Sequence, residues 1–247
     1  MRRLIVISAL ALAAAATAQP AMQPPEATRT STPAVLGAIG RRIAAAKDGE
    51  TIVVSAGTYR ERLRIDRPVR LVAEGKAVID GGGCGDIVEI AAPGVEVRGF
   101  TIRDTGTDLD KENAGIRVLA AHVTLEGNTL EDVLFGIDLR EAPDCIIRGN
   151  RIGGKNLDIA RRGDGLRLWR SDRTLVEGNT IHDGRDAILW YSQDVTVRNN
   201  RSARCRYGFH LMFSDGVTIQ GNELTENSVG VYLMYSKVVR REGNRLL

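Results

Sequence analysis

The chain has 247 residues, a formal net charge of +3 and 43% hydrophobic residues, which is enough apolar material for a sizeable core. Glycine is abundant and aromatic residues are few, which favours a repeat protein over an ordinary globule. The positive charge comes from scattered arginines, which argues against a nucleic-acid partner. Cys84, Cys145 and Cys205 lack the spacing of a zinc site and predict no disulfide framework, and Cys145 is interpreted as a core residue.

Residues 1–18 predict a cleavable secretory signal, because two arginines precede an apolar run that ends in small residues. This run is shorter than the roughly 20 residues that a membrane span needs. The mature protein is therefore expected to be soluble outside the cytoplasm. Residues 19–32 are rich in Pro, Thr and Ala and are expected to form a flexible lead-in, and residues 33–247 are expected to form one domain.

One short amphipathic helix is predicted at the start of this domain. Thr32 is the expected N-cap and Pro33 the first helical residue, after which Val35, Ile39 and Ile43 recur every four residues. The apolar stripe of this helix would cover the open end of a stacked sheet, where strand edges are otherwise unpaired. We therefore expect an N-terminal capping helix.

Short β-branched runs separated by glycine replace the helical pattern from Thr51 onward. From Val123 onward, a strand followed by a Gly-Asn or Asn-Asn turn recurs. The turn asparagines, separated by 22, 29, 21, 22 and 22 residues, are Asn128, Asn150, Asn179, Asn200, Asn222 and Asn244. Such coils bury a core only by stacking, so the predicted fold class is all-β, a right-handed single-stranded parallel β-helix. The longest step implies that residues 153–162 form a loop outside the coil.

The asparagines themselves are interpreted as structural. Asparagine accepts the left-handed conformation of a tight turn, and stacked amides hydrogen-bond from one coil to the next.

Extracellular β-helices often act on acidic polysaccharides, which requires carboxylates or a base clustered on one outer sheet. The expected outward column of the second strand in each coil contains no carboxylate pair. It consists of Arg117, Asp138, Arg167, Leu189, His210 and Tyr232.

Two further acidic groups favour structural roles. Ion pairs are expected where three aspartates lie near three arginines, namely Asp164, Asp183 and Asp186 with Arg162, Arg167 and Arg185. A solvated loop is expected for an acidic run that lacks the spacing of a calcium loop, namely Asp104, Asp108, Asp110 and Glu112. The isolated histidines His122 and His182 are interpreted as surface groups.

Two consecutive coils, with the sequences GFHLMFS and GVYLMYS, carry the most unusual chemistry. Strand alternation turns His210 and Met212 outward together, and Tyr232 and Met234 stand at the matching positions one coil further on. Imidazole and thioether groups on one face are ligands that can hold Cu(I). The alternative is that both methionines pack against loops or a partner, because methionine is an adaptable apolar filler.

Six coils and one early segment carry a resemblance to a known family. They are NAGIRV, LFGIDL, RRGDGLRLW, RDAILWYS, RYGFHLMFS and VGVYLMYS, with the early DGETIVVSAGTYRERLRIDRPVRLVAEGKAVIDGGG. In this order they closely resemble the NosD family of periplasmic copper-binding proteins, which take part in the maturation of nitrous oxide reductase. The RYGFHLMFS coil is the most specific of them.

The resemblance implies a non-enzymatic periplasmic protein that works with the permease and ATPase of an ABC transporter. It implies a part in supplying copper or sulfur for the copper-sulfide centre of the enzyme, and nitrous oxide reductase or a copper chaperone as a further partner. The bound metal is then expected to be copper, and the soft ligands favour Cu(I). The family's His and Met positions fall on His210, Met212 and Met234. Chains of the family normally run further, so more coils and a cap are expected beyond Leu247, and an end at Leu247 would expose strand edges.

Two hypotheses compete with copper binding. Analogy of fold alone favours a polysaccharide lyase, epimerase or hydrolase. A passive binding module is the other, because an arginine-rich outer face would engage an anionic glycan through electrostatic contacts that high salt abolishes. That face consists of Arg198, Arg201, Arg204 and Arg206.

Overall fold

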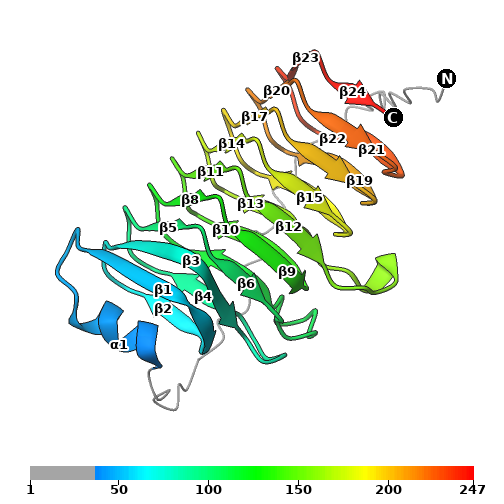
Figure 1. Ribbon diagram of the computed structural model, residues 1–247. Helices are drawn as coiled ribbons and strands as arrows, with labels where there is room; N and C mark the ends of the chain where they lie inside the picture. The colour runs from blue at the N-terminus through cyan, green and yellow to red at the C-terminus, as the bar shows by residue number, and fades with distance from the viewer. Residues whose placement is uncertain (1–36) are drawn as a thin grey trace. The chain divides into compact units, whose positions relative to one another are not determined.

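Residues 37–247 are the part of the chain that the computed structural model describes. Their strands stack in parallel into a β-solenoid (Figure 1), which confirms the predicted all-β parallel β-helix. The signal peptide of residues 1–18 and the lead-in of residues 19–32 lie outside the described residues. Within the described part, no helix is long and apolar enough to cross a membrane.

Helix α1 (Ala38–Ala45) packs against the first strands of the solenoid and buries Ile39 and Ile43, as predicted. The helix begins at Ala38, after an extended Gly37 at the N-cap position. The expected N-cap Thr32 and first helical residue Pro33 lie outside the described residues. The carboxylate of Glu61, from the segment after the first strand, accepts hydrogen bonds from the backbone N–H groups of Ile39 and Gly40, at 3.0 and 2.9 Å. This distant carboxylate satisfies donors that a local N-cap would otherwise satisfy.

Each coil contributes strands to a 16-stranded sheet and to an eight-stranded sheet. The larger sheet folds around β3 (Arg70–Asp80), whose two ends pair with different neighbours. β1 (Thr51–Arg60) pairs with β3 along its whole length and lies off both branches. The first branch contains β5 (Glu96–Arg98), β8 (Thr124–Glu126), β11 (Ile146–Arg148), β14 (Leu175–Glu177), β17 (Thr196–Arg198), β20 (Thr218–Gln220) and β23 (Arg240–Glu242). The second branch contains β6 (Thr101–Arg103), β9 (Thr129–Val133), β12 (Arg151–Gly154), β15 (Thr180–His182), β18 (Arg201–Ala203), β21 (Glu223–Thr225) and β24 (Arg245–Leu246).

The eight-stranded sheet carries the residues that matter most below. Its strands are β2 (Leu63–Ile65), β4 (Val88–Ile90), β7 (Ala114–Val118), β10 (Phe135–Arg140), β13 (Leu166–Trp169), β16 (Asp186–Trp190), β19 (Tyr207–Met212) and β22 (Val229–Met234). Leucines on these strands stack in register inside the solenoid and are fully buried, namely Leu139, Leu168, Leu189 and Leu211. Burial of each such side chain stabilises the fold by about 1.5–3 kcal/mol.

The expected outward position of Leu189 is therefore wrong. Arg167 pairs with Ile188, which in turn pairs with His210, so Ile188 occupies the outward column. The register of β16 against β19 shifts between Asp186 and Ile188, because β19 has one more residue there than β16. This β-bulge lies directly before His210.

The asparagine ladder is confirmed as a structural device. The Oδ1 atom of Asn179 accepts hydrogen bonds from both the backbone N–H and the Nδ2 group of Asn150, at 2.9 and 3.0 Å. This pair of asparagines spans the 29-residue repeat. The same hydrogen bonds link the other ladder asparagines. The ladder asparagines do not adopt the left-handed conformation, which falls on the residue before each, such as Gly178 with φ 66° and Asn199 with φ 55°. Glycine adopts it without steric cost.

The insertion after β12 forms the predicted loop, although Gly153 and Gly154 still belong to the strand. The loop contains a 3-10 turn, η1 (Ile159–Arg161). Cys145 is buried in the core, as predicted.

Candidate metal centre

Two outward columns run along the eight-stranded sheet, and both change character along the solenoid. The first consists of Arg64, Glu89, Arg117, Asp138, Arg167, Ile188, His210 and Tyr232. The second consists of Arg140, Trp169, Trp190, Met212 and Met234. In both, charged side chains give way to apolar, aromatic and sulfur-containing ones.

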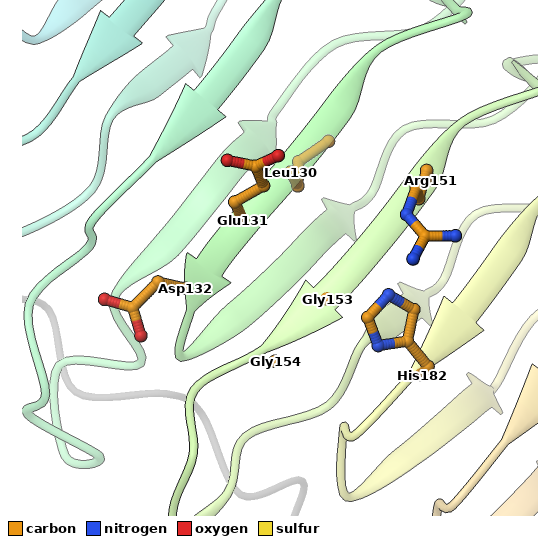
Figure 2. Close-up of a pocket in the computed structure, with 7 residues that line it drawn as sticks. All are labelled: Leu130, Glu131, Asp132, Arg151, Gly153, Gly154 and His182. Carbon is orange, nitrogen blue, oxygen red and sulfur yellow. The ribbon is translucent and has the colours of Figure 1, made fainter.

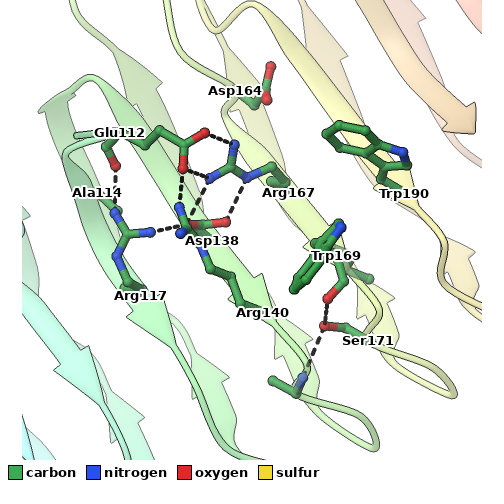
Figure 3. A network of polar contacts seen from close by, with 12 residues as sticks. Glu112, Ala114, Arg117, Asp138, Arg140, Asp164, Arg167, Trp169, Ser171 and Trp190 are labelled. Carbon is green, nitrogen blue, oxygen red and sulfur yellow. Dashed lines mark hydrogen bonds and ion pairs between the residues drawn. The ribbon is translucent and has the colours of Figure 1, made fainter. Parts of the chain in front are cut away.

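The charged part centres on Asp138, which is fully buried (Figure 3). Its carboxylate accepts hydrogen bonds from Arg117, Arg140 and Arg167 at 2.5–2.9 Å. Burial alone would raise the pKa of Asp138, but the charge and hydrogen bond of Arg167, followed by the other two arginines, hold that pKa below its usual value. These groups are fully paired and leave no free base or acid.

Glu112 belongs to the same cluster, which corrects its assignment to a solvated loop. It is half-buried, and Arg167 donates two hydrogen bonds to its carboxylate at 2.7 and 2.8 Å. Burial would raise the pKa of Glu112, but Arg167 lowers it. For Asp108 the expectation of an exposed loop holds, since it pairs only with neighbouring Lys111.

The aspartates near the next strands form ion pairs, as predicted, but the partners differ. The pairs are Asp164 with Arg185, Asp183 with Arg204, and Asp186 with Arg206. Arg162 instead donates to the backbone oxygen atoms of Leu157 and Arg204.

Asp164 differs from the other two in its pKa. Burial raises it to about 6, against the lowering effect of Arg185.

The arginine-rich face expected to engage a glycan is neutralised. Each of its four arginines lies beside a carboxylate, which belongs to Glu177, Glu223, Asp183 or Asp186. Little positive charge is therefore left for an anionic chain.

His210 has the opposite environment to Asp138. Its side chain is nearly buried, and its ring contacts the edges or faces of Tyr207 and Tyr232, both at 5.1 Å between centroids. Its Nδ1 atom lies 3.5 Å from Oδ2 of Asp186. Burial would raise the pKa of Asp186, but this contact with His210, together with Arg206, holds that pKa below its usual value. The Nε2 atom of His210 is buried without a hydrogen-bond partner. Buried polar atoms are normally paired. The imidazole is therefore available as a ligand.

The two methionines lie in register on neighbouring strands, because Met212 pairs directly with Met234. His210 is two residues before Met212 on the same face of β19, and both methionines are partly exposed. The structure thus brings His210, Met212 and Met234 onto one patch, which we call the His-Met patch. Among residues 37–247, no group of three or more His, Cys, Asp or Glu side chains is arranged to hold a metal.

The donor set of the His-Met patch fits copper in its reduced form. Thioethers and a neutral imidazole suit Cu(I), whereas calcium, magnesium and manganese prefer oxygen ligands. The Nε2 atom of His210 is the observation that makes the fit specific, because a packing role alone gives no reason to bury a ring nitrogen without a hydrogen-bond partner. Strand alternation placed these three residues and Tyr232 on one face from the sequence alone. It did not show the ring contact of Tyr207 with His210 or the pairing of Trp190 with Met212, since the register of the preceding coil could not be read.

A separate shallow pocket lies on the second branch of the larger sheet (Figure 2). It is lined by Leu130, Glu131, Asp132, Arg151, Gly153, Gly154 and His182. The Nδ1 atom of His182 lies 2.8 Å from a carboxylate oxygen of Asp183, and a Cβ atom on Gly153 would lie only 2.8 Å from the imidazole. His182 is thus a half-buried pocket residue, which corrects its interpretation as an isolated surface group, whereas His122 is exposed as expected.

Fold and patch together define a parallel β-helix protein with a candidate soft-metal site on an outer face. Residues 149–247, which include the whole His-Met patch, match the family described as periplasmic copper-binding protein (NosD). This confirms the resemblance stated from the sequence.

Curated relatives agree with this match. The chain is 34% identical over 136 residues to a probable ABC transporter binding protein NosD of Pseudomonas aeruginosa, which covers 54% of this chain and 32% of the relative. It is 30% identical over 134 residues to the protein of the same name in Stutzerimonas stutzeri, with coverage of 53% and 31%. The chain spans about a third of the length of these relatives.

Solved structures share the fold. The pectate lyase Pel9A matches with a TM-score of 0.58 at 14% identity, over 81% of this chain and 70% of the lyase. At this identity the likeness concerns the architecture alone.

Proposed function

We propose that this chain is a non-enzymatic periplasmic protein that binds Cu(I) through His210, Met212 and Met234 and serves the maturation of the copper-sulfide centre of nitrous oxide reductase. The buried Nε2 atom of His210, which lacks a hydrogen-bond partner and lies beside the paired methionines, is the observation that carries the proposal. The description of the matched family supports copper and the periplasm. The names of the curated relatives support work with an ABC transporter.

In this proposal, copper is cargo. His210 and Met212 from β19 and Met234 from β22 would hold Cu(I) with one imidazole nitrogen and two thioether sulfurs. Asp186, beside Nδ1, would orient the ring and leave Nε2 for the metal. Because both methionines are partly exposed, the cargo would be reachable by a partner that delivers or removes it.

The proposed partners are the permease and ATPase of the transporter, together with nitrous oxide reductase or a copper chaperone. ATP hydrolysis would then take place in the transporter. The chain itself would contribute binding and presentation of the metal.

The test is a competition titration of Cu(I) against a chromogenic chelator under reducing, anaerobic conditions. We expect one tight site in the native protein and its loss in the triple variant His210→Ala, Met212→Leu, Met234→Leu. The control variant His122→Ala removes an exposed histidine remote from the patch and is expected to bind normally. Equal binding by the triple variant would contradict the assignment.

One observation favours a second candidate, an enzyme acting on uronate polymers. His182, oriented by Asp183, shares the shallow pocket with Arg151 and two carboxylates. Such a histidine can remove the proton next to a sugar carboxylate while a cation stabilises the developing charge. Pectate and alginate should then yield unsaturated products, detected by ultraviolet absorbance, and His182→Ala should abolish them. Absence of products and of new reducing ends with the native protein would exclude this candidate.

A further inference from the structure

We infer that Trp190 forms part of the same site, as an aromatic face that contacts the bound monovalent cation from the neighbouring coil. The inference rests on the proposed Cu(I) site and adds a residue to it. It also predicts the metal selectivity of the site, because an aromatic face that acts through its π electrons favours a weakly hydrated soft cation over a strongly hydrated one.

The register places Trp190 next to the proposed ligands. Trp190 pairs directly with Met212, just as Met212 pairs with Met234 on the other side. Neighbouring strands lie about 4.8 Å apart, so the side chains of this column stand one above another. Met212 is thus flanked by the indole of Trp190 in one coil and by the thioether of Met234 in the next.

Ring geometry shows which part of Trp190 faces Met212. Tyr191 and Phe213, one coil apart, have parallel rings with centroids 5.0 Å apart and an interplanar angle of 6°. Because this separation is close to the distance between coils, the ring faces point along the solenoid axis. The plane of Trp190 lies within 19° of that of Tyr191. The indole therefore presents its face to the coil of Met212.

The surroundings of Trp190 strengthen a contact of this kind. Its side chain is partly buried, and its Nε1 atom is buried without a hydrogen-bond partner, so water is largely excluded from that side. Attraction between a cation and the face of tryptophan is strongest where the pair is desolvated. A soft cation held by His210 and Met212 would meet such a face.

Trp169 provides a matched contrast in the same column, as Figure 3 shows, and pairs with Trp190 on the adjacent strand. The guanidinium group of Arg170 lies over the ring of Trp169, 4.8 Å from its centroid. One ring face of Trp169 is therefore occupied by a cation of the protein itself. Trp190 has no such cation over its ring among the described residues.

Tryptophan fluorescence can report on each residue separately, because the chain contains only two tryptophans and each single variant retains one of them. The probe is Ag(I), a redox-stable substitute for Cu(I), titrated into the full chain and into the variants Trp169→Phe and Trp190→Leu. We expect Ag(I) to quench the emission of Trp169→Phe, in which Trp190 alone emits, and to leave the emission of Trp190→Leu nearly unchanged. Zn(II) should quench neither.

Affinity is measured separately by competition with a chelator. Trp190→Leu should weaken Ag(I) binding by about three- to thirty-fold, in keeping with the usual strength of a cation–π contact. Circular dichroism verifies that the variants are folded. Stoichiometric binding without quenching of Trp190, or with unchanged affinity in Trp190→Leu, would overturn the inference and leave the copper site standing. Absence of binding in the native chain would overturn both.

Discussion

In the coils of β7, β10 and β13, the outward columns of the eight-stranded sheet hold arginines and an aspartate that satisfy one another completely. In the coils of β16, β19 and β22, the same columns hold an imidazole, two thioethers and aromatic rings, and the Nε2 atom of the imidazole is left without a hydrogen bond. The backbone positions are equivalent. The difference therefore lies in whether the polar groups have partners within the chain.

This contrast separates a structural cluster from a candidate site more clearly than residue type does. Asp138 is the more buried and more strongly charged group, yet its three arginine partners leave it nothing to bind. His210 contacts Asp186 through Nδ1 and packs against Tyr207 and Tyr232, but its buried Nε2 atom has no partner inside the chain. An external ligand would provide the missing partner.

The largest expected effect comes from breaking the charged cluster. Asp138→Ala leaves Arg117 and Arg167 buried without their shared carboxylate and should lower the free energy of unfolding by roughly 3–5 kcal/mol. Urea denaturation followed by circular dichroism measures the change. The control is Asp144→Ala, which removes an exposed partner of Arg173 and should leave the midpoint nearly unchanged. Similar midpoints for the two variants would contradict the distinction between buried and exposed pairs.

A smaller effect is expected at Asp164, which lies between the two regions. Burial raises its pKa from 3.8 to about 6. Because the folded state holds the proton more tightly than the unfolded state, the presence of Asp164 lowers the free energy of unfolding as the pH rises between these two values.

Asp164→Asn cannot ionise and should escape this loss. Relative to the native protein, it should gain about 1–3 kcal/mol between pH 4 and pH 7. Thermal unfolding at both pH values measures the gain, and Asp144→Asn serves as a surface control. The contrary result is that the native protein and Asp164→Asn differ in free energy of unfolding by the same amount at pH 4 and at pH 7. That result would show that Asp164 is already charged at pH 4 in the folded protein.

The smallest effect on stability is expected at His210. Because Nε2 has no hydrogen-bond partner, and because Asp186 keeps its ion pair with Arg206 when the contact with Nδ1 is lost, His210→Phe should change the free energy of unfolding by only about 1 kcal/mol or less. The same variant should lose Cu(I) binding in the chelator assay. A loss of stability comparable to that of Asp138→Ala would instead assign His210 to the structural network.

The sequence allowed the fold and most of the patch to be predicted, because both follow from periodicity. The asparagine spacing marks the coils, and alternation along β19 turns His210 and Met212 to one side. The pairing of Trp190 with Met212 could not be predicted, because it depends on a bulge whose position only the hydrogen-bonded register shows. The helix cap from Glu61 and the role of Glu112 were missed for a similar reason, since both depend on contacts between segments distant in sequence.

The bulge before His210 has a consequence for the comparison of coils by length. It adds one residue to β19, so Gly208 and Phe209 together lie opposite Ala187 alone, and the extra residue is accommodated before the strand reaches the patch. From Ile188 and His210 onward the two strands are again in register, so coils that differ by one residue keep the same inward and outward positions there. Residues of the patch can therefore be compared between coils only by counting back from the end of the strand, because counting forward from its start would exchange the two faces.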